Sequence, residues 1–261
     1  MPVGYDSRAG VAVITLDRPE VLNAFNDDLG RDALEAVMRA SDDPETRCVV
    51  ITGAGRAFCS GEDLGALSAT YDSGIAPELG RILRDRYNPL IRAIRAAPKP
   101  VVAAINGVAA GAGASLALAC DFRIASERAK LVLAFIKVGL VPDSGAVWFL
   151  TRMVGSARAW QLAASGDPID SEQALALGLV TRIAPAKDFE QSWRSFAETL
   201  AQGPTSALAL TKSLVTASTT MSLEEQLELE IDAQSQAGSS DDHMEGVRAF
   251  LGKRPAHFTG R

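Results

Sequence analysis

Histidine is scarce in this sequence. Among 261 residues the only histidines are His243 and His257, and both stand near the C-terminus. A Ser-His-Asp triad would need one of these two residues, and a zinc site would lack its most common ligand. Cysteine is almost as sparse: Cys48, Cys59 and Cys120 are odd in number and lack metal-ligand spacing. We predict reduced, buried cysteines in a cytoplasmic protein that has no metal site.

Long apolar runs and an excess of basic residues are also missing. No apolar run reaches the roughly 18 residues of a membrane-spanning helix, and no basic stretch precedes an apolar core near the N-terminus. The net charge of −6 and the pI near 5.1 argue against nucleic acid or an anionic membrane as the main partner. A Walker motif is absent, and residues 111–113 lack the third glycine of a dinucleotide-binding fingerprint. Local groups, not a global field, must therefore meet any anionic ligand.

Two glycine-rich segments, residues 53–64 and 106–115, are the most informative features that are present. Each follows a β-branched apolar run, 48–52 or 101–106, that is typical of a buried strand. Small residues at a strand end let main-chain N–H groups point into a site without a side chain in the way. Two such groups converging on one oxygen form an oxyanion hole. The pattern therefore predicts chemistry that stabilises an enolate or a tetrahedral oxyanion on a carbonyl substrate.

The rest of the pattern predicts one large domain with mixed strands and helices. Asn26 is expected to cap a helix, and Ser222 with Glu225 forms a capping box. Strand, strand and helix recur along the chain, which favours coiled ββα units over a doubly wound sheet. The late helices carry more apolar surface than a monomer needs, so a homo-oligomer is expected. Further strands are expected at 11–16, 121–126 and 131–135, a surface segment at 65–80, and helices at 81–97 (kinked at Pro89), 113–119, 156–164, 171–177, 205–215 and 222–236.

Residues 17–25, the two glycine-rich segments and residues 139–145 (Gly-Leu-Val-Pro-Asp-Ser-Gly) resemble the crotonase (enoyl-CoA hydratase/isomerase) superfamily in order and spacing. The resemblance covers nearly the whole chain. It implies an α/β fold in which residues 1–200 form a spiral of ββα units and residues 201–261 a helical C-terminal trimerisation region. It also implies an acyl-CoA thioester substrate, no cofactor apart from the coenzyme A of that substrate, and assembly as a trimer or a dimer of trimers.

Shorter segments are similar to one branch of this superfamily. Residues 87–90, 106–119, 134–135 and 250–254 resemble the isomerases that convert the ring epoxide of phenylacetyl-CoA to its oxepin form in phenylacetate degradation. This resemblance implies an acyl-CoA isomerase. A Δ3,Δ2-enoyl-CoA isomerase, an enoyl-CoA hydratase and a non-catalytic acyl-CoA-binding scaffold remain as alternatives.

The resemblance also assigns catalytic roles. The family's oxyanion donors fall on the backbone N–H groups of Ser60 and Ala112. Hydratases use two glutamates, but Ser115 and Phe135 stand at those positions, and neither can act as a general base. Asp143 stands where a dienoyl-CoA isomerase-like member places its aspartate, which implies a proton shuttle in a pocket dried by Phe135. An N-cap role for Asp143 remains open.

A further group of positions is implied to bind the CoA moiety or the acyl group. Phe250 and Lys253 would reach the adenine and phosphates from a neighbouring subunit, although Lys253 also fits a simple exposed residue. Other roles stay open for Asp63, which could order its loop, for Glu62, which could be solvated, and for Tyr87, which could belong to the core. The full set is Val21, Leu22, Ala24, Phe58, Gly61, Glu62, Asp63, Leu64, Tyr87, Gly111, Phe135, Phe250 and Lys253.

Overall fold

Two β-sheets form the centre of the molecule in the computed structural model, which describes residues 1–74 and 76–261. In the larger sheet β1 is antiparallel to β2 and every other pair is parallel. Its spatial order is β1 (Val3–Arg8), β2 (Val11–Leu16), β3 (Cys48–Gly53), β5 (Val101–Ile105), β7 (Phe122–Ser126) and β10 (Arg182–Ala184). The smaller sheet has the order β4 (Ala57–Cys59), β6 (Val108–Ala110), β8 (Lys130–Val132) and β9 (Ile169–Asp170).

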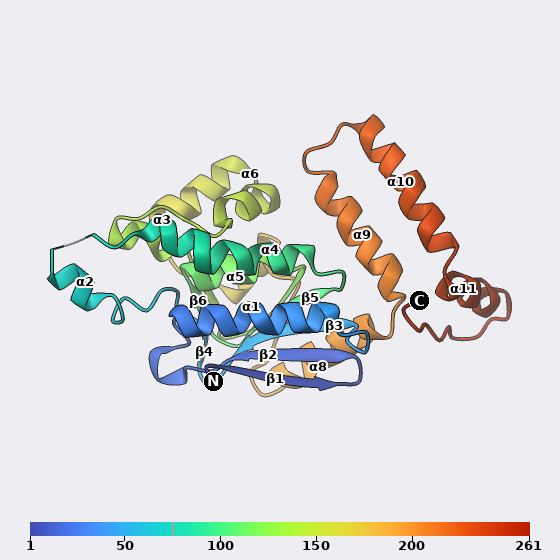
Figure 1. Cartoon of the computed structure of the whole chain (residues 1–261), viewed down its shortest axis with the longest axis horizontal. Coiled ribbons are helices and arrows are strands. Elements are labelled where there is room, and N and C mark those ends of the chain that lie inside the picture. Colours follow the sequence, from blue (N-terminus) through green and yellow to red (C-terminus); the bar gives the residue numbers. More distant parts are fainter. Residues whose placement is uncertain (75) are drawn as a thin grey trace.

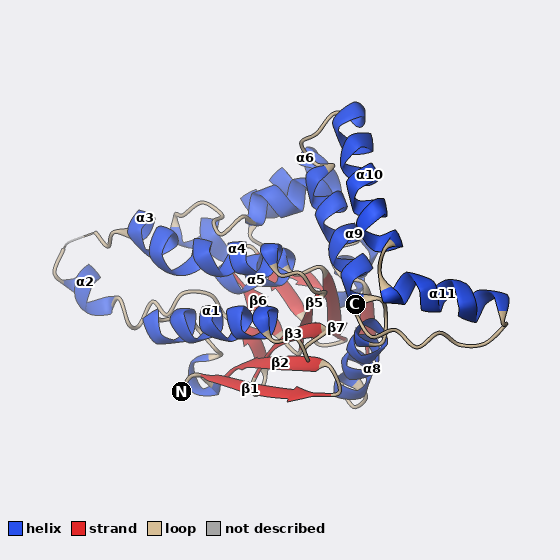
Figure 2. Cartoon of the chain, turned by 45° about the vertical axis from the view of Figure 1, so that its right-hand side comes forward, coloured by secondary structure: helices blue, strands red, loops and turns tan. Residues whose placement is uncertain are grey.

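The chain steps repeatedly from the larger sheet to the smaller one. β3 is followed by β4, β5 by β6 and β7 by β8, and a helical segment follows each pair. This alternation winds the chain into a spiral of ββα units, which confirms the predicted α/β fold. Figure 2 shows the strands in the lower middle of the view, with helices above and beside them.

Helices cover both faces of the larger sheet. Ile14 and Ile51 face the main core, whereas Val13 and Val50 point to the opposite face, where Trp193 of α8 packs. Because successive strand residues point to opposite faces, both faces need a helical cover. The helices of this part are α1 (Asp27–Asp42), α2 (Ser68–Asp72), α3 (Leu79–Ile82), α4 (Asn88–Ala96), α5 (Ala112–Ala119), α6 (Ala146–Ser165), α7 (Ser171–Ala176) and α8 (Phe189–Ala201).

The last three helices, α9 (Thr205–Ala217), α10 (Leu223–Gly238) and α11 (Asp241–Leu251), lie to one side of the sheets. In Figure 1 they stand at one end of the long axis, and α2 and α3 lie towards the other end. The Ser222–Glu225 capping box at the start of α10 is present as predicted. Across the described ranges, 1–74 and 76–261, no helix is both long and apolar enough to cross a membrane.

Several elements differ from the prediction. The expected helix 81–97 is divided by a π-helical turn (η2, Leu83–Tyr87), and Pro89 lies in the first turn of α4, where its missing N–H breaks no hydrogen bond. The expected strand 131–135 ends at Val132, and Phe135 lies on a 3-10 helix (η3, Ala134–Val138). The surface segment 65–80 contains α2 and the start of α3, and Ile75 in it lies outside the described residues. The helices α8 and α11 and the strands β1, β4, β6, β9 and β10 were not predicted.

Candidate active site

A mostly apolar cavity of about 230 Å³ brings together many of the predicted site residues. Helices α2 and α3, the turns η2 and η3 and both glycine-rich loops contribute to its wall. Leucine, isoleucine and valine side chains make up much of this wall, so they shield its few polar groups from water. The predicted residues on the wall are Glu62, Leu64, Tyr87, Gly111, Ala112, Phe135 and Asp143.

The backbone amides of Glu62 and Ala112 are among those at the cavity that have no hydrogen-bond acceptor in the described part of the chain. Ala112 is the first residue of α5, whose N-terminal amides and dipole favour negative charge. The loops that carry the amides touch through Gly61, where a Cβ would lie 3.0 Å from the Ala110 carbonyl oxygen and 3.5 Å from the Ala112 nitrogen. The positive φ of 97° and the short distance both favour glycine at this position, so the geometry suits two donors for one oxygen.

Ser60 does not supply one of these donors, which corrects the sequence assignment. Its N–H donates to the Leu22 carbonyl oxygen at 3.0 Å, and its hydroxyl donates to the Val21 carbonyl oxygen at 3.2 Å. Leu22 and Asn23 both adopt the left-handed conformation, with φ of 56° and 58°, and this turn presents the Leu22 carbonyl to Ser60. The unpaired amide is therefore that of Glu62, two residues further along the loop.

Asp143 lies half-buried in the loop between η3 and α6. The Ser144 hydroxyl donates to Asp143 Oδ1 at 2.8 Å, and the Ser115 hydroxyl donates to the Asp143 carbonyl oxygen at 3.0 Å. Burial raises the pKa of the Asp143 carboxyl; the hydrogen bond from Ser144 opposes this rise and the negative charge of Glu62 adds to it. The N-cap of α6 is Gly145, so the alternative N-cap role for Asp143 is wrong.

Consecutive left-handed residues hold the Asp143 loop. Ser144 and Gly145 have φ of 51° and 80°, and Ser144 is buried. A non-glycine residue in this region costs about 1–2 kcal/mol, and such strain is retained mainly where the surrounding structure fixes the backbone. The role of Ser144 was not predicted, because its only signal in the sequence is its place next to Asp143.

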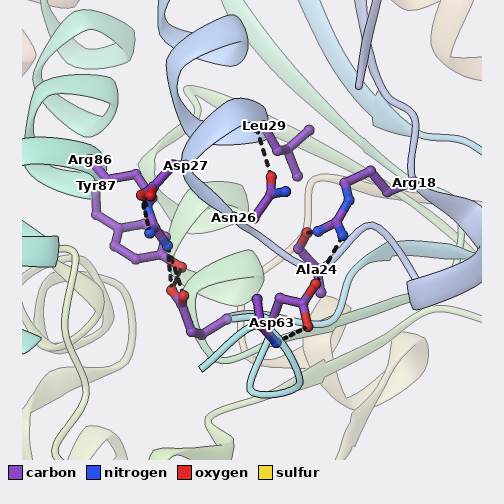
Figure 3. A network of polar contacts seen from close by, with 10 residues as sticks. Arg18, Ala24, Asn26, Asp27, Leu29, Asp63, Arg86 and Tyr87 are labelled. Atoms are coloured by element: carbon purple, nitrogen blue, oxygen red, sulfur yellow. Dashed lines mark hydrogen bonds and ion pairs between the residues drawn. The ribbon is translucent and has the colours of Figure 1, made fainter. Parts of the chain in front are cut away.

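Glu62 is not the solvated side chain that was one interpretation of the sequence. Arg86 Nη1 lies 2.7 Å from Glu62 Oε1 and 2.9 Å from Oε2, and the Tyr87 hydroxyl also donates to Oε2. Arg86 in turn pairs with Asp27 at the start of α1, as Figure 3 shows. The Arg86 side chain is only 9% exposed and the Glu62 side chain 19%. Sequence analysis missed Arg86, although it stands beside the predicted Tyr87.

Tyr87 belongs to both the core and the cavity wall. It is 4% exposed, and its ring meets that of Phe25 edge-on with 5.2 Å between the centroids. Burial, the charge of Glu62 and the hydrogen bond to Glu62 raise the pKa of the Tyr87 hydroxyl, so this group stays protonated and acts as a donor. Tyr87 is therefore a core residue that also lines the cavity, and its contact with a substrate stays a prediction.

The segment before α1 packs on the first glycine-rich loop. Arg18 donates to the Ala24 carbonyl oxygen at 2.7 Å and pairs with Asp63 at 2.9 Å, as Figure 3 shows. Asp63 also accepts from the Ala66 N–H, so it orders its loop, as one of the two sequence interpretations proposed. The Phe58 side chain is fully buried, and the expectation that the loop it begins contacts the CoA moiety stays a prediction.

Phe250 and Lys253 do not lie at the cavity of their own chain. Phe250 is near the end of α11 and is 83% exposed, and Lys253 follows it. Figure 1 places α11 at the opposite end of the long axis from α2 and α3, which line the cavity. A contribution from a neighbouring subunit stays a prediction.

Comparison with known proteins extends the resemblance to the full chain. The model of the family described as enoyl-CoA hydratase/isomerase matches residues 6–261. A probable enoyl-CoA hydratase of Rhodobacter capsulatus is 48% identical over 99% of this chain and 98% of that protein. The 1,2-epoxyphenylacetyl-CoA isomerase of Escherichia coli is 44% identical over 97% of this chain and 96% of that protein.

A solved structure agrees with these matches. The crystal structure of a protein from Mycobacterium abscessus, assigned as an enoyl-CoA hydratase/isomerase, superposes with a TM-score of 0.94 at 40% identity. The superposition covers 99% of this chain and 100% of that one. Both the sequence matches and the fold extend over nearly the entire chain, and the protein therefore belongs to the enoyl-CoA hydratase/isomerase family.

Proposed function

We propose that this enzyme is an acyl-CoA isomerase that moves a double bond toward the thioester carbonyl. The observation that carries the proposal is the pairing of two unpaired amides, those of Glu62 and Ala112, with the carboxyl of Asp143 on one apolar cavity. The thioester oxygen would accept from both amides, which stabilises the enolate formed when the adjacent carbon loses a proton. Loss of one such donor typically costs about 3–4 kcal/mol of transition-state stabilisation.

Asp143 is the proposed proton shuttle. Its carboxylate would take a proton from the carbon next to the carbonyl and return it to the carbon two positions further along the acyl chain. No atom is gained or lost and no electron leaves the substrate, so the step needs no additional cofactor. The raised pKa of Asp143 suits a group that must accept the proton and then release it.

The ring-epoxide reaction has the same core step. Opening the epoxide of 1,2-epoxyphenylacetyl-CoA to the seven-membered oxepin leaves a ring double bond two carbons from the thioester carbonyl. Moving that double bond into conjugation with the thioester carbonyl requires the same transfer of one proton. The 44% identity to the Escherichia coli 1,2-epoxyphenylacetyl-CoA isomerase favours this substrate over an aliphatic 3-enoyl ester.

Hydration is the less favoured reaction. The Ser115 hydroxyl donates to the Asp143 carbonyl oxygen, and Phe135 presents an apolar ring. Glu62 is the remaining carboxylate of the wall among the described residues, and Arg86 and Tyr87 occupy its oxygens. A water molecule would therefore lack the second free carboxylate that addition to a double bond requires.

We also propose that residues 201–261 form an interface between copies of this chain. The three C-terminal helices expose large apolar side chains, which in a lone chain would face water at a cost of about 25 cal/mol per Å². A neighbouring copy would bring Phe250 and Lys253 towards the CoA moiety. The exposed side chains are Val215, Met221, Leu223, Leu227, Ile231, Met244, Val247, Phe250 and Leu251.

Three substrates separate the alternatives. The protein is mixed with a 3-enoyl-CoA, a 2-enoyl-CoA and 1,2-epoxyphenylacetyl-CoA, and conjugation to the thioester is followed by ultraviolet absorbance. The proposal predicts gain of conjugation from the first and third esters and no hydration of the second. Hydration of the 2-enoyl ester would favour a hydratase, and binding without any reaction would favour a scaffold.

A further inference from the structure

Backbone hydrogen bonds of the neighbouring residues and contacts to its side chain both hold Glu62, while its backbone N–H has no acceptor among the described residues. On the backbone side, the Phe25 N–H donates to the Gly61 carbonyl at 2.7 Å, and the Asp63 N–H donates to the Phe25 carbonyl at 2.9 Å. On the side-chain side, Arg86 and Tyr87 contact the carboxylate. The backbone contacts and the side-chain contacts together therefore restrict the movement of Glu62.

A glycine inside α1, Gly30, makes room for the Arg86 side chain. Gly30 lies inside this helix, where glycine typically costs about 1 kcal/mol relative to alanine. A Cβ on Gly30 would lie 2.4 Å from Arg86 Cγ, so the glycine provides the space along which the Arg86 stem passes. The guanidinium can then reach Asp27 on one side and Glu62 on the other.

We propose that Arg86 and Tyr87 form a clamp on the Glu62 carboxylate that positions the Glu62 amide as an oxyanion-hole donor, so that Glu62 and Arg86 are positioning residues. The inference rests on the proposed function, because it takes the thioester oxygen as the group that accepts from the Glu62 amide. A donor on a loop must be held in place before the charge develops if it is to stabilise the transition state. Backbone contacts alone fix the residues on either side of Glu62, and the clamp fixes Glu62 itself.

The test measures the donor strength directly, without turnover. Phenylacetyl-CoA labelled with ¹³C at the thioester carbonyl is bound to each protein, and the carbonyl stretch is measured by isotope-edited infrared spectroscopy. Hydrogen bonds from the two amides should lower the stretching frequency in the wild-type complex relative to the free ester. In Arg86→Met and in Glu62→Gln this lowering should shrink by half or more, and kcat should fall about tenfold or more at similar KM.

Two further variants sharpen the comparison. Arg84→Met removes an exposed arginine from the same π-helical turn and should keep the full carbonyl shift. Tyr87→Phe removes one donor and leaves both Arg86 contacts, so its shift should be intermediate. Glu62→Gln is isosteric, so it keeps the test valid if Arg86→Met fails to fold. A full shift in both Arg86→Met and Glu62→Gln would overturn the clamp, whereas no shift in the wild type would overturn the oxyanion hole itself.

Discussion

The hydroxyl of Ser115 lies 3.0 Å from the carbonyl oxygen of Asp143 and donates a hydrogen bond to it. Ser115 is in the first turn of α5, the helix that begins with the unpaired amide of Ala112. One hydrogen bond therefore joins the proposed amide donor to the proposed proton shuttle. Ser115, where the family resemblance implies a glutamate in hydratases, thus connects two parts of the proposed site.

Replacing Ser115 by alanine should loosen this connection. We expect kcat to fall several-fold with little change in KM, and stability to fall by about 1 kcal/mol, the usual worth of one hydrogen bond. Ser41→Ala is the matched control, because Ser41 donates to the Val37 carbonyl on α1 at 2.8 Å, away from the cavity. An unchanged kcat in Ser115→Ala would argue against a connecting role.

Replacing Asp143 by asparagine should make the protein more stable at neutral pH. The folded-state pKa of Asp143 is raised, so the stability linked to this group is present below its unfolded pKa and is lost as pH rises through the folded pKa. At pH 7 the wild type carries the cost of the buried charge and Asp143→Asn does not. A rise in Tm on the order of 1–3 °C is expected, and it should shrink as the pH falls. A lower Tm at pH 7 would contradict the pKa argument.

Replacing Gly61 by alanine should disable the oxyanion hole. Gly61 has φ of 97°, and a Cβ there would lie 3.0 Å from the Ala110 carbonyl oxygen, so the loop and the Glu62 amide must shift. A fall in kcat of about 10²–10³-fold is expected, as for the loss of one donor. Gly74→Ala shares the positive φ, at 73°, but no atom of the described residues lies within 4 Å of its Cβ, so it should keep full activity.

The pH dependence of kcat should report the charge of Glu62. Asp143 removes the first proton in its ionised form, so activity should rise with pH through the raised pKa of Asp143. Glu62→Gln removes a negative charge that helps to raise this pKa, and the acidic limb should therefore move to lower pH. Burial is the larger cause and remains, so the limb should stay above the range of an ordinary aspartate. An unmoved limb would show that Glu62 does not act on Asp143.

Local sequence signals predicted several helices and strands of the core but missed β1, the short strands β4, β6, β9 and β10, and the helices α8 and α11. The helix that Asn26 caps begins with a recognisable capping residue, and β3 is long enough to show the apolar run of a buried strand. β6 has only three residues and is defined by its partners β4 and β8, which are distant in sequence. Strands of this length carry no readable alternation, so tertiary pairing alone determines them.

The site shows the same division. The family resemblance pointed to Ala112 and Asp143, and both line the cavity. The choice of Glu62 over Ser60 depends on the left-handed turn at Leu22, which no composition rule predicts for a leucine. Arg86 was missed because its role depends on the space left by Gly30 on another helix.

The most direct test of the proposed mechanism is the conjugation rate of a 3-enoyl-CoA with Asp143→Asn, measured together with the dissociation constant of an unreactive CoA ester. If Asp143 moves the proton, kcat should fall by about 10²–10⁴-fold while the dissociation constant stays within a few-fold of the wild-type value. A variant that isomerises the ester at the wild-type rate would contradict the account.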